Sequence, residues 1–243
     1  MRWKTLGRRC IYRSEGIRIY DNLFFRWLTF DTRPIQTLIN KWYPHRPELH
    51  YIKPLVFMAQ QLPGDCCLLG LGGAGVAHVL AKPLNRFTIT AVEMEAEIIH
   101  LASRYFQIDK RVNLSIVHQE ASQYVRENHS IFRHVIVDLF NASSFPESCH
   151  NPEFFAHCKR LLMENGVLAV NLANQQEHKP IFDFIRRIFP GNTVVLPIPE
   201  SANMVILAQK NETANTLTDF LKSTSHLKHL AWDPRWGCMA AIK

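Results

Sequence analysis

A glycine-rich segment followed by an acidic residue is the part of this sequence best suited to chemistry. The segment Cys66–Gly75 reads CCLLGLGGAG, and Glu93 follows its last glycine by 18 residues. Gly70 would allow a tight turn between a strand and a helix, and Gly72 and Gly73 would let backbone N–H groups approach a ligand. A carboxylate at this offset accepts hydrogen bonds from ribose hydroxyls. The pattern predicts an adenine-nucleotide site, and the alternative is a glycine turn that only packs strand on helix.

Other polar residues follow the next predicted strands of the same region. Gln119 and Glu120 come after a strand predicted at 112–117, and Asp138 ends one predicted at 132–138. Ligands bind outside the carboxyl ends of the strands in an open α/β sheet, so these residues should meet. Glu120 could accept a hydrogen bond from an adenine amino group, or it could be a first-turn acid that favours the helix dipole. Asp138 could be an N-cap, but the convergence of strand ends favours a site residue.

The elements that must position these residues alternate regularly from residue 66 onward. Apolar runs predict strands at 66–70, 87–93, 112–117, 132–138 and 166–172, and helices fill the gaps at 74–82, 95–106, 120–128, 153–164 and 176–188. This order predicts a parallel sheet covered by helices on both faces. A short loop separates 193–198 from 204–208, which predicts an antiparallel hairpin. The α/β arrangement resembles the class I S-adenosylmethionine-methyltransferase (Rossmann-like) fold. Residues 211–243 are expected to form a short helix and an irregular tail.

The first sixty residues predict a small β-rich unit, so we divide the chain into 1–60 and a nucleotide-binding domain at 61–243. Alternating side chains predict a strand at 16–20, paired through a turn with a second strand at 24–30. A helix is predicted at 55–62. The aromatic segment Trp42–His45 could close over a substrate, but packing of the small unit onto the main domain is the favoured interpretation.

The composition is that of an ordinary globular protein, and its charge is unevenly placed. The chain has 243 residues, of which 47% are hydrophobic and 20% charged. Residues 1–60 hold 11 Lys/Arg and 4 Asp/Glu, whereas residues 61–243 hold 17 of each sign. A basic segment can steer an anionic partner, but no nucleic-acid-binding motif accompanies it, so a solvated basic face is favoured. With no long apolar run and no apolar leader, we expect a cytoplasmic protein without a membrane or nucleic-acid partner.

Cysteines and histidines do not form a metal-binding pattern. None of the six cysteines lies in a C-x-x-C motif, and Cys66 and Cys67 are adjacent in a predicted buried strand. We therefore expect reduced thiols and no metal. The pair His226 and His229 lies in the predicted tail, where solvated side chains are the favoured interpretation.

Several segments together resemble the spermidine synthase (polyamine aminopropyltransferase) family, in its shorter spermidine-synthase-like branch. The matching segments are LTFD at 28–31, IQT at 35–37, HY at 50–51, LGLGGAG at 69–75, AVEME at 91–95, QEA at 119–121 and VIVD at 135–138. The resemblance covers about residues 16–209 and includes the β unit ahead of the nucleotide fold. It implies an enzyme that binds decarboxylated S-adenosylmethionine and transfers its aminopropyl group to an amine.

The resemblance also implies roles for individual residues. Glu93 would hold the ribose, Glu120 would face the adenine in place of the usual aspartate, and Gln36 would contact the nucleotide. Tyr51 and Asp138 would position and deprotonate the attacking amine, because an ammonium ion is not a nucleophile.

Three departures from the family pattern bear on the substrate. Gly73 and Asn141 stand where the family carries aspartates, and Lys53 lies near the place of a glutamate. Fewer carboxylates should weaken selection of a polycationic amine. The ligand could therefore be intact S-adenosylmethionine in a methyltransferase with an unknown acceptor, or the chain could be a non-catalytic nucleotide-binding homologue. Family members commonly form dimers, so a homodimer is possible.

Overall fold

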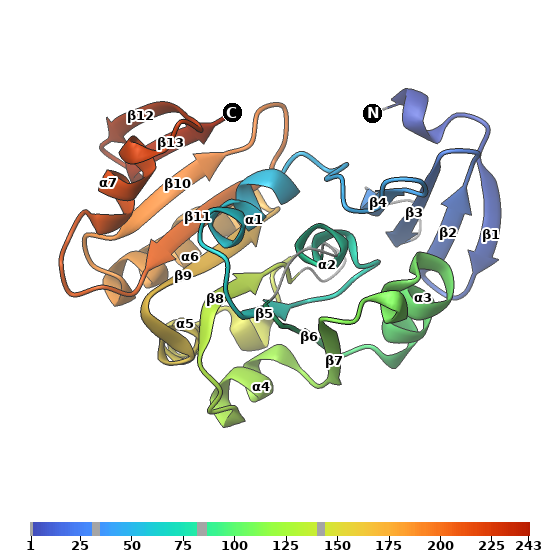
Figure 1. Cartoon of the computed structure of the whole chain (residues 1–243), viewed down its shortest axis with the longest axis horizontal. Coiled ribbons are helices and arrows are strands. Elements are labelled where there is room, and N and C mark those ends of the chain that lie inside the picture. The colour runs from blue at the N-terminus through green and yellow to red at the C-terminus, as the bar shows by residue number, and fades with distance from the viewer. Residues whose placement is uncertain (1, 31–34, 82–86, 140–143) are drawn as a thin grey trace.

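The chain folds into two β-sheets joined by helices (Figure 1). The structure is a computed structural model, and it describes residues 2–30, 35–81, 87–139 and 144–243. The smaller sheet is antiparallel, with its four strands in chain order. Its strands are β1 (Arg9–Arg13), β2 (Ile17–Asp21), β3 (Phe25–Phe30) and β4 (Ile35–Asn40). Alternate residues of β2 are buried, as expected for a strand with one covered face.

The larger sheet has nine strands in the order β12-β13-β10-β11-β9-β8-β5-β6-β7. The strands are β5 (Cys66–Leu69), β6 (Ile89–Glu93), β7 (Leu114–His118), β8 (Phe132–Val137), β9 (Leu162–Leu172), β10 (Thr193–Pro197), β11 (Met204–Gln209), β12 (Leu227–Asp233) and β13 (Gly237–Ile242). Strands β5 to β9 pair in parallel, whereas β11 pairs antiparallel with both β9 and β10. All four residues of β5 are buried because helices cover both faces at the centre of the sheet.

Helices cover the two faces of the larger sheet in separate groups. On one face lie α1 (Ile52–Gln61), α2 (Gly75–Leu80) and α7 (Thr216–Ser223), which share a hydrophobic core with the sheet. On the opposite face lie α4 (Ala121–Glu127), α5 (Pro152–Arg160) and α6 (Gln175–Ile188), which build a second core (Figure 1). Short 3-10 helices occur at Arg2–Thr5, Ile108–Lys110 and Glu147–Cys149.

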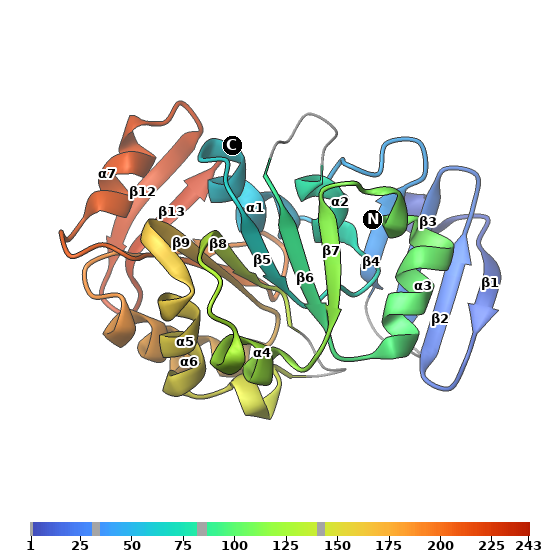
Figure 2. The same ribbon diagram turned by 60° about the horizontal axis from the view of Figure 1, so that its bottom comes forward.

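Helix α3 (Ala96–Phe106) connects the two sheets (Figure 2). Its residues Ile98, Leu101 and Phe106 are buried in one cluster with β2 and β3 of the smaller sheet. The hydroxyl of Tyr12, on β1, donates a hydrogen bond of 2.6 Å to Glu97. The smaller sheet is therefore held beside the carboxyl end of β6, which α3 follows directly.

The structure confirms the predicted fold class. Each of the five predicted βα units is present, and residues 193–197 and 204–209 form the predicted antiparallel hairpin. The N-terminal strands predicted at 16–20 and 24–30 are β2 and β3, which pair antiparallel. The division into units at residue 60 stays a prediction. Helix α1 begins at Ile52, before that boundary, and packs against the larger sheet.

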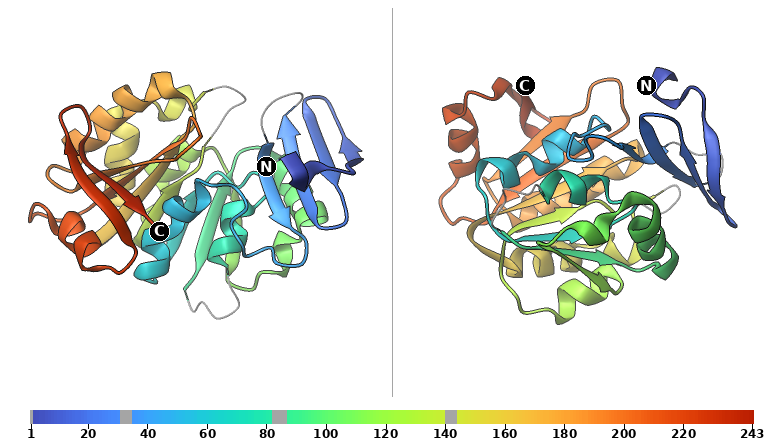
Figure 3. Two further views of the ribbon diagram at one scale, coloured as in Figure 1. Left: turned by 90° about the horizontal axis from the view of Figure 1, so that it is seen from above. Right: turned by 45° about the vertical axis from the view of Figure 1, so that its right-hand side comes forward.

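Two predicted elements were wrong. Residues 211–243 do not end in an irregular tail, since β12 and β13 form a hairpin that extends the sheet, and β13 pairs in parallel with β10 (Figure 3). The helix predicted at 153–164 ends at Arg160, because Leu162 already pairs with Phe132 in the sheet. Among the described residues, no helix combines the length and apolar character needed to span a bilayer.

Candidate functional site

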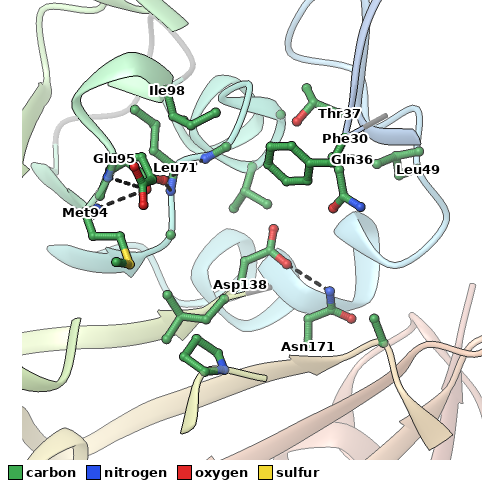
Figure 4. Close-up of a pocket in the computed structure, with 18 of the residues that line it drawn as sticks. Phe30, Gln36, Thr37, Leu49, Leu71, Met94, Glu95, Ile98, Asp138 and Asn171 are labelled. Carbon is green, nitrogen blue, oxygen red and sulfur yellow. Dashed lines mark hydrogen bonds between the residues drawn. The ribbon is translucent and has the colours of Figure 1, made fainter. Parts of the chain in front are cut away.

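A cavity of about 710 Å³ opens at the carboxyl ends of β5, β6, β8 and β9. Strand β4 of the smaller sheet and the start of α1 supply the wall opposite the strand ends (Figure 4). Most of the residues predicted to act in the site line this cavity: Gln36, Tyr51, Gly70, Gly72, Glu93, Glu120 and Asp138. Gly73 is not among the lining residues. The strand-end argument therefore predicted where Glu93, Glu120 and Asp138 meet, and the family resemblance added Gln36 and Tyr51.

The loop after β5 requires glycine for steric reasons at two positions. Gly70 has φ +94°, and a Cβ there would lie 2.4 Å from the carbonyl oxygen of Asp138. A Cβ on Gly73 would lie 2.7 Å from the side chain of Thr37, whose Oγ1 accepts a hydrogen bond of 3.0 Å from the Gly73 N–H. Thr37 therefore fixes the loop against β4, a contact that the sequence did not predict.

Glu93 holds the same loop from the other side. Its Oε2 accepts hydrogen bonds from the N–H groups of Leu71 (3.0 Å) and Gly72 (3.2 Å). Its Oε1 accepts from Met94 (3.0 Å) and Glu95 (3.1 Å). An ionised carboxylate offers about four lone-pair positions, so four backbone donors match its capacity. A ribose would have to share or replace some of these bonds.

The remaining N–H groups of the loop also have acceptors within the chain. The Gly70 N–H bonds the carbonyl of Val92 at 2.9 Å, and the Ala74 N–H bonds that of Leu71 at 2.8 Å. Every N–H from residue 70 to residue 74 is thus engaged by the protein itself. The backbone of this loop does not offer an open set of donors for an anionic group.

Asp138 lies at the centre of a polar network at the end of β8. Its Oδ2 accepts a hydrogen bond of 3.1 Å from the Tyr51 hydroxyl, and its Oδ1 accepts one of 2.8 Å from Asn171 Nδ2. Burial raises the pKa of the Asp138 carboxyl to about 6, although both hydrogen bonds oppose this. Burial and the charge of Asp138 raise the pKa of Tyr51 well above its ordinary value. Tyr51 therefore remains a donor, and Asp138 is the group of the pair that can take up a proton near neutral pH.

The network continues away from Asp138 through residues that the sequence analysis missed. Asn203 Nδ2 donates to Asn171 Oδ1 at 2.9 Å, and the Ser201 hydroxyl donates to Asn203 Oδ1 at 2.7 Å. Asn171 could have been noticed, because it is a polar residue within the apolar run of β9 and is only 6% exposed. Nothing in the local sequence marks Ser201 or Asn203, which reach the site from the β10–β11 loop.

Glu120 lies at the cavity but is occupied as a helix N-cap. Its carboxylate accepts from the Gln123 N–H at 2.9 Å, from the Ser122 hydroxyl, and from the Ser148 hydroxyl at 3.1 Å. Although burial acts to raise it, these hydrogen bonds lower the pKa of Glu120. The structure places Glu120 as the N-cap of α4 rather than in its first turn, and a contact with adenine stays a prediction.

The charge of the cavity is opposite to that of the whole chain, whose formal net charge is +7. Six acidic side chains are among the residues that line it, at Glu15, Glu93, Glu95, Glu97, Glu120 and Asp138. Over the described part of the chain, the lining contains no lysine, arginine or histidine. Such a lining favours a cationic ligand and disfavours an anionic one.

The other candidate residues lie apart from the cavity. Trp42 and Tyr43 are 68% and 49% exposed, so the favoured interpretation, that this segment packs the small unit onto the main domain, was wrong. His226 and His229 are exposed, as predicted. Burial raises the pKa of the Cys66 thiol to about 12, which makes it an unreactive core residue. The described residues contain no group of three or more His, Cys, Asp or Glu side chains that could hold a metal ion.

Comparison with known proteins assigns the chain to a family. A family model described as the spermine/spermidine synthase domain matches residues 51–220, which include Tyr51, Glu93 and Asp138. The chain belongs to the spermine/spermidine synthase family. A polyamine aminopropyltransferase of Vibrio vulnificus is 25% identical over 83% of this chain and 71% of its own length. One from Chromobacterium violaceum is 23% identical over 66% of this chain, and the match spans 62% of that relative's length.

Several solved structures share the fold of this chain. A spermidine synthase in complex with the transition-state analogue AdoDATO has a TM-score of 0.70 at 20% identity, over 83% of this chain and 74% of its own. A probable spermidine synthase from Corynebacterium glutamicum has a TM-score of 0.71 at 16% identity, over 97% of this chain and 90% of its own. Human methyltransferase-like protein 13 in complex with SAH has a TM-score of 0.60 at 15% identity, over 77% of this chain and 97% of its own.

The departures from the family pattern now have a structural setting. At Gly73, the side chain of Thr37 fills the place that any Cβ would need, so an aspartate does not fit without a shift of β4. Lys53 is exposed on α1 and does not line the cavity. Asn141, together with Asp31 of the matching segment LTFD, lies outside the described residues. Among the described residues, Asp138 is then the carboxylate nearest to the amide network.

Proposed function

We propose that this protein transfers the aminopropyl group of decarboxylated S-adenosylmethionine to an amine. The observation that carries the proposal is the cavity beside Asp138, which pairs a carboxylate with the Tyr51 and Asn171 donors and has no basic residue in its described lining. Decarboxylated S-adenosylmethionine is a cation without a carboxylate, so it suits this lining. Membership of the spermine/spermidine synthase family supports the same substrate class.

Intact S-adenosylmethionine suits the cavity less well because of its α-carboxylate. That group needs a basic side chain or open backbone N–H donors, since an unpaired buried charge is costly. The described lining offers no basic side chain, and the N–H groups of residues 70–74 are already bonded. The carboxylate would also meet the negative charge of Asp138.

The geometry suggests how the transfer proceeds. Asp138 accepts a proton from the incoming amine, and Tyr51 and Asn171 hold the carboxylate in place. The neutral nitrogen then attacks the carbon next to the sulfonium, and the C–S bond breaks with its electron pair passing to sulfur. The products are methylthioadenosine and the aminopropylated amine. Glu93 holds the loop beside the ribose throughout.

A product assay tests the proposal. The protein is incubated with a mixture of primary amines and either decarboxylated or intact S-adenosylmethionine, and the nucleoside products are separated. We expect methylthioadenosine from the decarboxylated form, with loss of at least about a hundredfold in rate for Asp138→Asn. Glu200→Gln, an exposed change outside the cavity, is the control and should keep the wild-type rate.

Methyl transfer is the competing function. A likeness to an eEF1A lysine and N-terminal methyltransferase homolog of Drosophila melanogaster, 24% identical over 65% of this chain and 25% of that relative, favours it. S-adenosylhomocysteine formed from intact S-adenosylmethionine, with no methylthioadenosine from the decarboxylated form, would replace the proposal by this alternative.

A further inference from the structure

The part of the cavity beyond Asp138 is polar but almost uncharged. Figure 4 shows Glu95 and Met94 on one side of the cavity and Gln36 and Leu49 on the other, with Asp138 between them. The wall that continues from Asp138 consists of the amides, hydroxyl and small side chains of Asn171, Ala173, Ser201, Ala202 and Asn203. Among the described residues of this wall, Asp138 is the one carboxylate.

In the sequence, the segment that follows Asp138 adds no charge. Between Asp138 and Glu147 the chain reads LFNASSFP, which contains no ionisable side chain. Glu200 precedes the wall, but it is exposed and does not line the cavity. Among the described residues, Asp138 is therefore the one carboxylate of this wall, and the other acidic residues of the lining, such as Glu93 and Glu95, are not part of it.

The number of positive charges on the two substrates limits which amines can act as the acceptor. Decarboxylated S-adenosylmethionine brings two positive charges, one on its sulfonium and one on its ammonium group. A diamine acceptor would bring a further ammonium at its far end, even after its attacking nitrogen has lost a proton. A buried charge without a partner is costly, and this wall has no second carboxylate to pair with it.

The same wall suits an uncharged polar group. Asn171, Asn203 and Ser201 are joined by hydrogen bonds of 2.9 Å and 2.7 Å, and the backbone N–H of Asn203 donates to Ser201 Oγ at 3.1 Å. Each amide oxygen has two lone pairs and each amide nitrogen two hydrogens, so these side chains can bond a ligand hydroxyl or amide as well as each other.

We propose that the acceptor is a primary amine whose far end is an uncharged hydroxyl or amide, rather than a diamine. This inference rests on the proposed aminopropyl transfer. The amine nitrogen gives one proton to Asp138 and bonds the propyl carbon, and sulfur leaves with the C–S electron pair as methylthioadenosine. The product is a secondary amine that carries the aminopropyl ammonium at one end and the uncharged group at the other.

Two acceptors of equal length test the inference directly. The rate of methylthioadenosine formation from decarboxylated S-adenosylmethionine is measured with 4-aminobutan-1-ol and with 1,4-diaminobutane. We expect kcat/KM for the amino alcohol to exceed that for the diamine by about tenfold or more. Equal or better use of the diamine overturns this inference and leaves the aminopropyl transfer intact. Absence of methylthioadenosine with every amine overturns both.

A charge-restoring variant gives a second, independent readout. Asn203→Asp adds one carboxylate to the wall and keeps the acceptor oxygen for the Ser201 hydroxyl. We expect it to shift the ratio of the two kcat/KM values toward the diamine by about tenfold, mainly through KM. Glu200→Gln is the control and should leave the ratio unchanged, and binding of methylthioadenosine verifies that each variant is folded. An unchanged ratio in Asn203→Asp, in a variant that binds methylthioadenosine normally, contradicts the inference.

Discussion

Glu93 should contribute to folding as well as to nucleotide binding, and Glu93→Gln tests the contribution to folding. The glutamate carboxylate accepts four backbone hydrogen bonds, two on each oxygen. A glutamine can accept only on its oxygen, so its NH₂ group would face two N–H donors. Either the Leu71–Gly72 pair or the Met94–Glu95 pair must lose its acceptor.

The expected cost follows from the number of bonds lost. A hydrogen bond to a charged group contributes about 1.5–3 kcal/mol, and Glu93 is partly exposed, so the lower end of that range applies. Loss of two such bonds should lower the free energy of unfolding by about 3 kcal/mol. The affinity for methylthioadenosine should fall as well, because the loop at the proposed ribose site loses its anchor.

Urea unfolding followed by tryptophan fluorescence measures the change. Glu95→Gln is the matched control, since Glu95 also lines the cavity but is exposed and makes no cap hydrogen bond with its side chain. The control should stay within about 0.5 kcal/mol of the wild type. A loss of less than about 0.5 kcal/mol in Glu93→Gln would refute the structural role assigned to this carboxylate.

Three further results are expected. Because the folded-state pKa of Asp138 is raised to about 6, kcat/KM should rise as the pH increases through 6, and a flat profile between pH 5 and 8 would argue against Asp138 as the proton acceptor. Gly73→Ala should destabilise the fold by about 1–3 kcal/mol, measured by urea unfolding, because its Cβ would collide with Thr37. Burial lowers the pKa of His78 and of His134 to about 4, so the stability that is present above pH 6.5 should be lost as the pH falls. At pH 5 each histidine should lower the free energy of unfolding by about 2 kcal/mol. Equal free energies of unfolding at pH 7 and pH 5 would contradict this.

The central part of the fold could be predicted because its signals are local. Strands such as β5 and β8 are short apolar runs, and polar residues directly after them meet at one edge of a parallel sheet. Gly70, Glu93 and Asp138 were found in this way, and the family resemblance added Gln36 and Tyr51. The cavity lining shows that they gather at one place.

The parts that were missed depend on contacts between distant segments. Strand β13 joins the sheet through a single register pair with β10, Val195 with Met239. No residue of β12 is buried, so this strand lacks a clear alternation of buried and exposed side chains. The bond between Thr37 and Gly73 joins residues 36 positions apart, and that between Asn203 and Asn171 joins residues 32 apart. Only the folded chain brings such pairs together, so neither could be inferred from spacing.

Calorimetric titration with the two forms of the nucleotide tests the central claim most directly. The account predicts that decarboxylated S-adenosylmethionine binds at least about tenfold more tightly than intact S-adenosylmethionine, because the α-carboxylate meets an acidic lining with no basic side chain among its described residues. Equal or tighter binding of the intact form would contradict it.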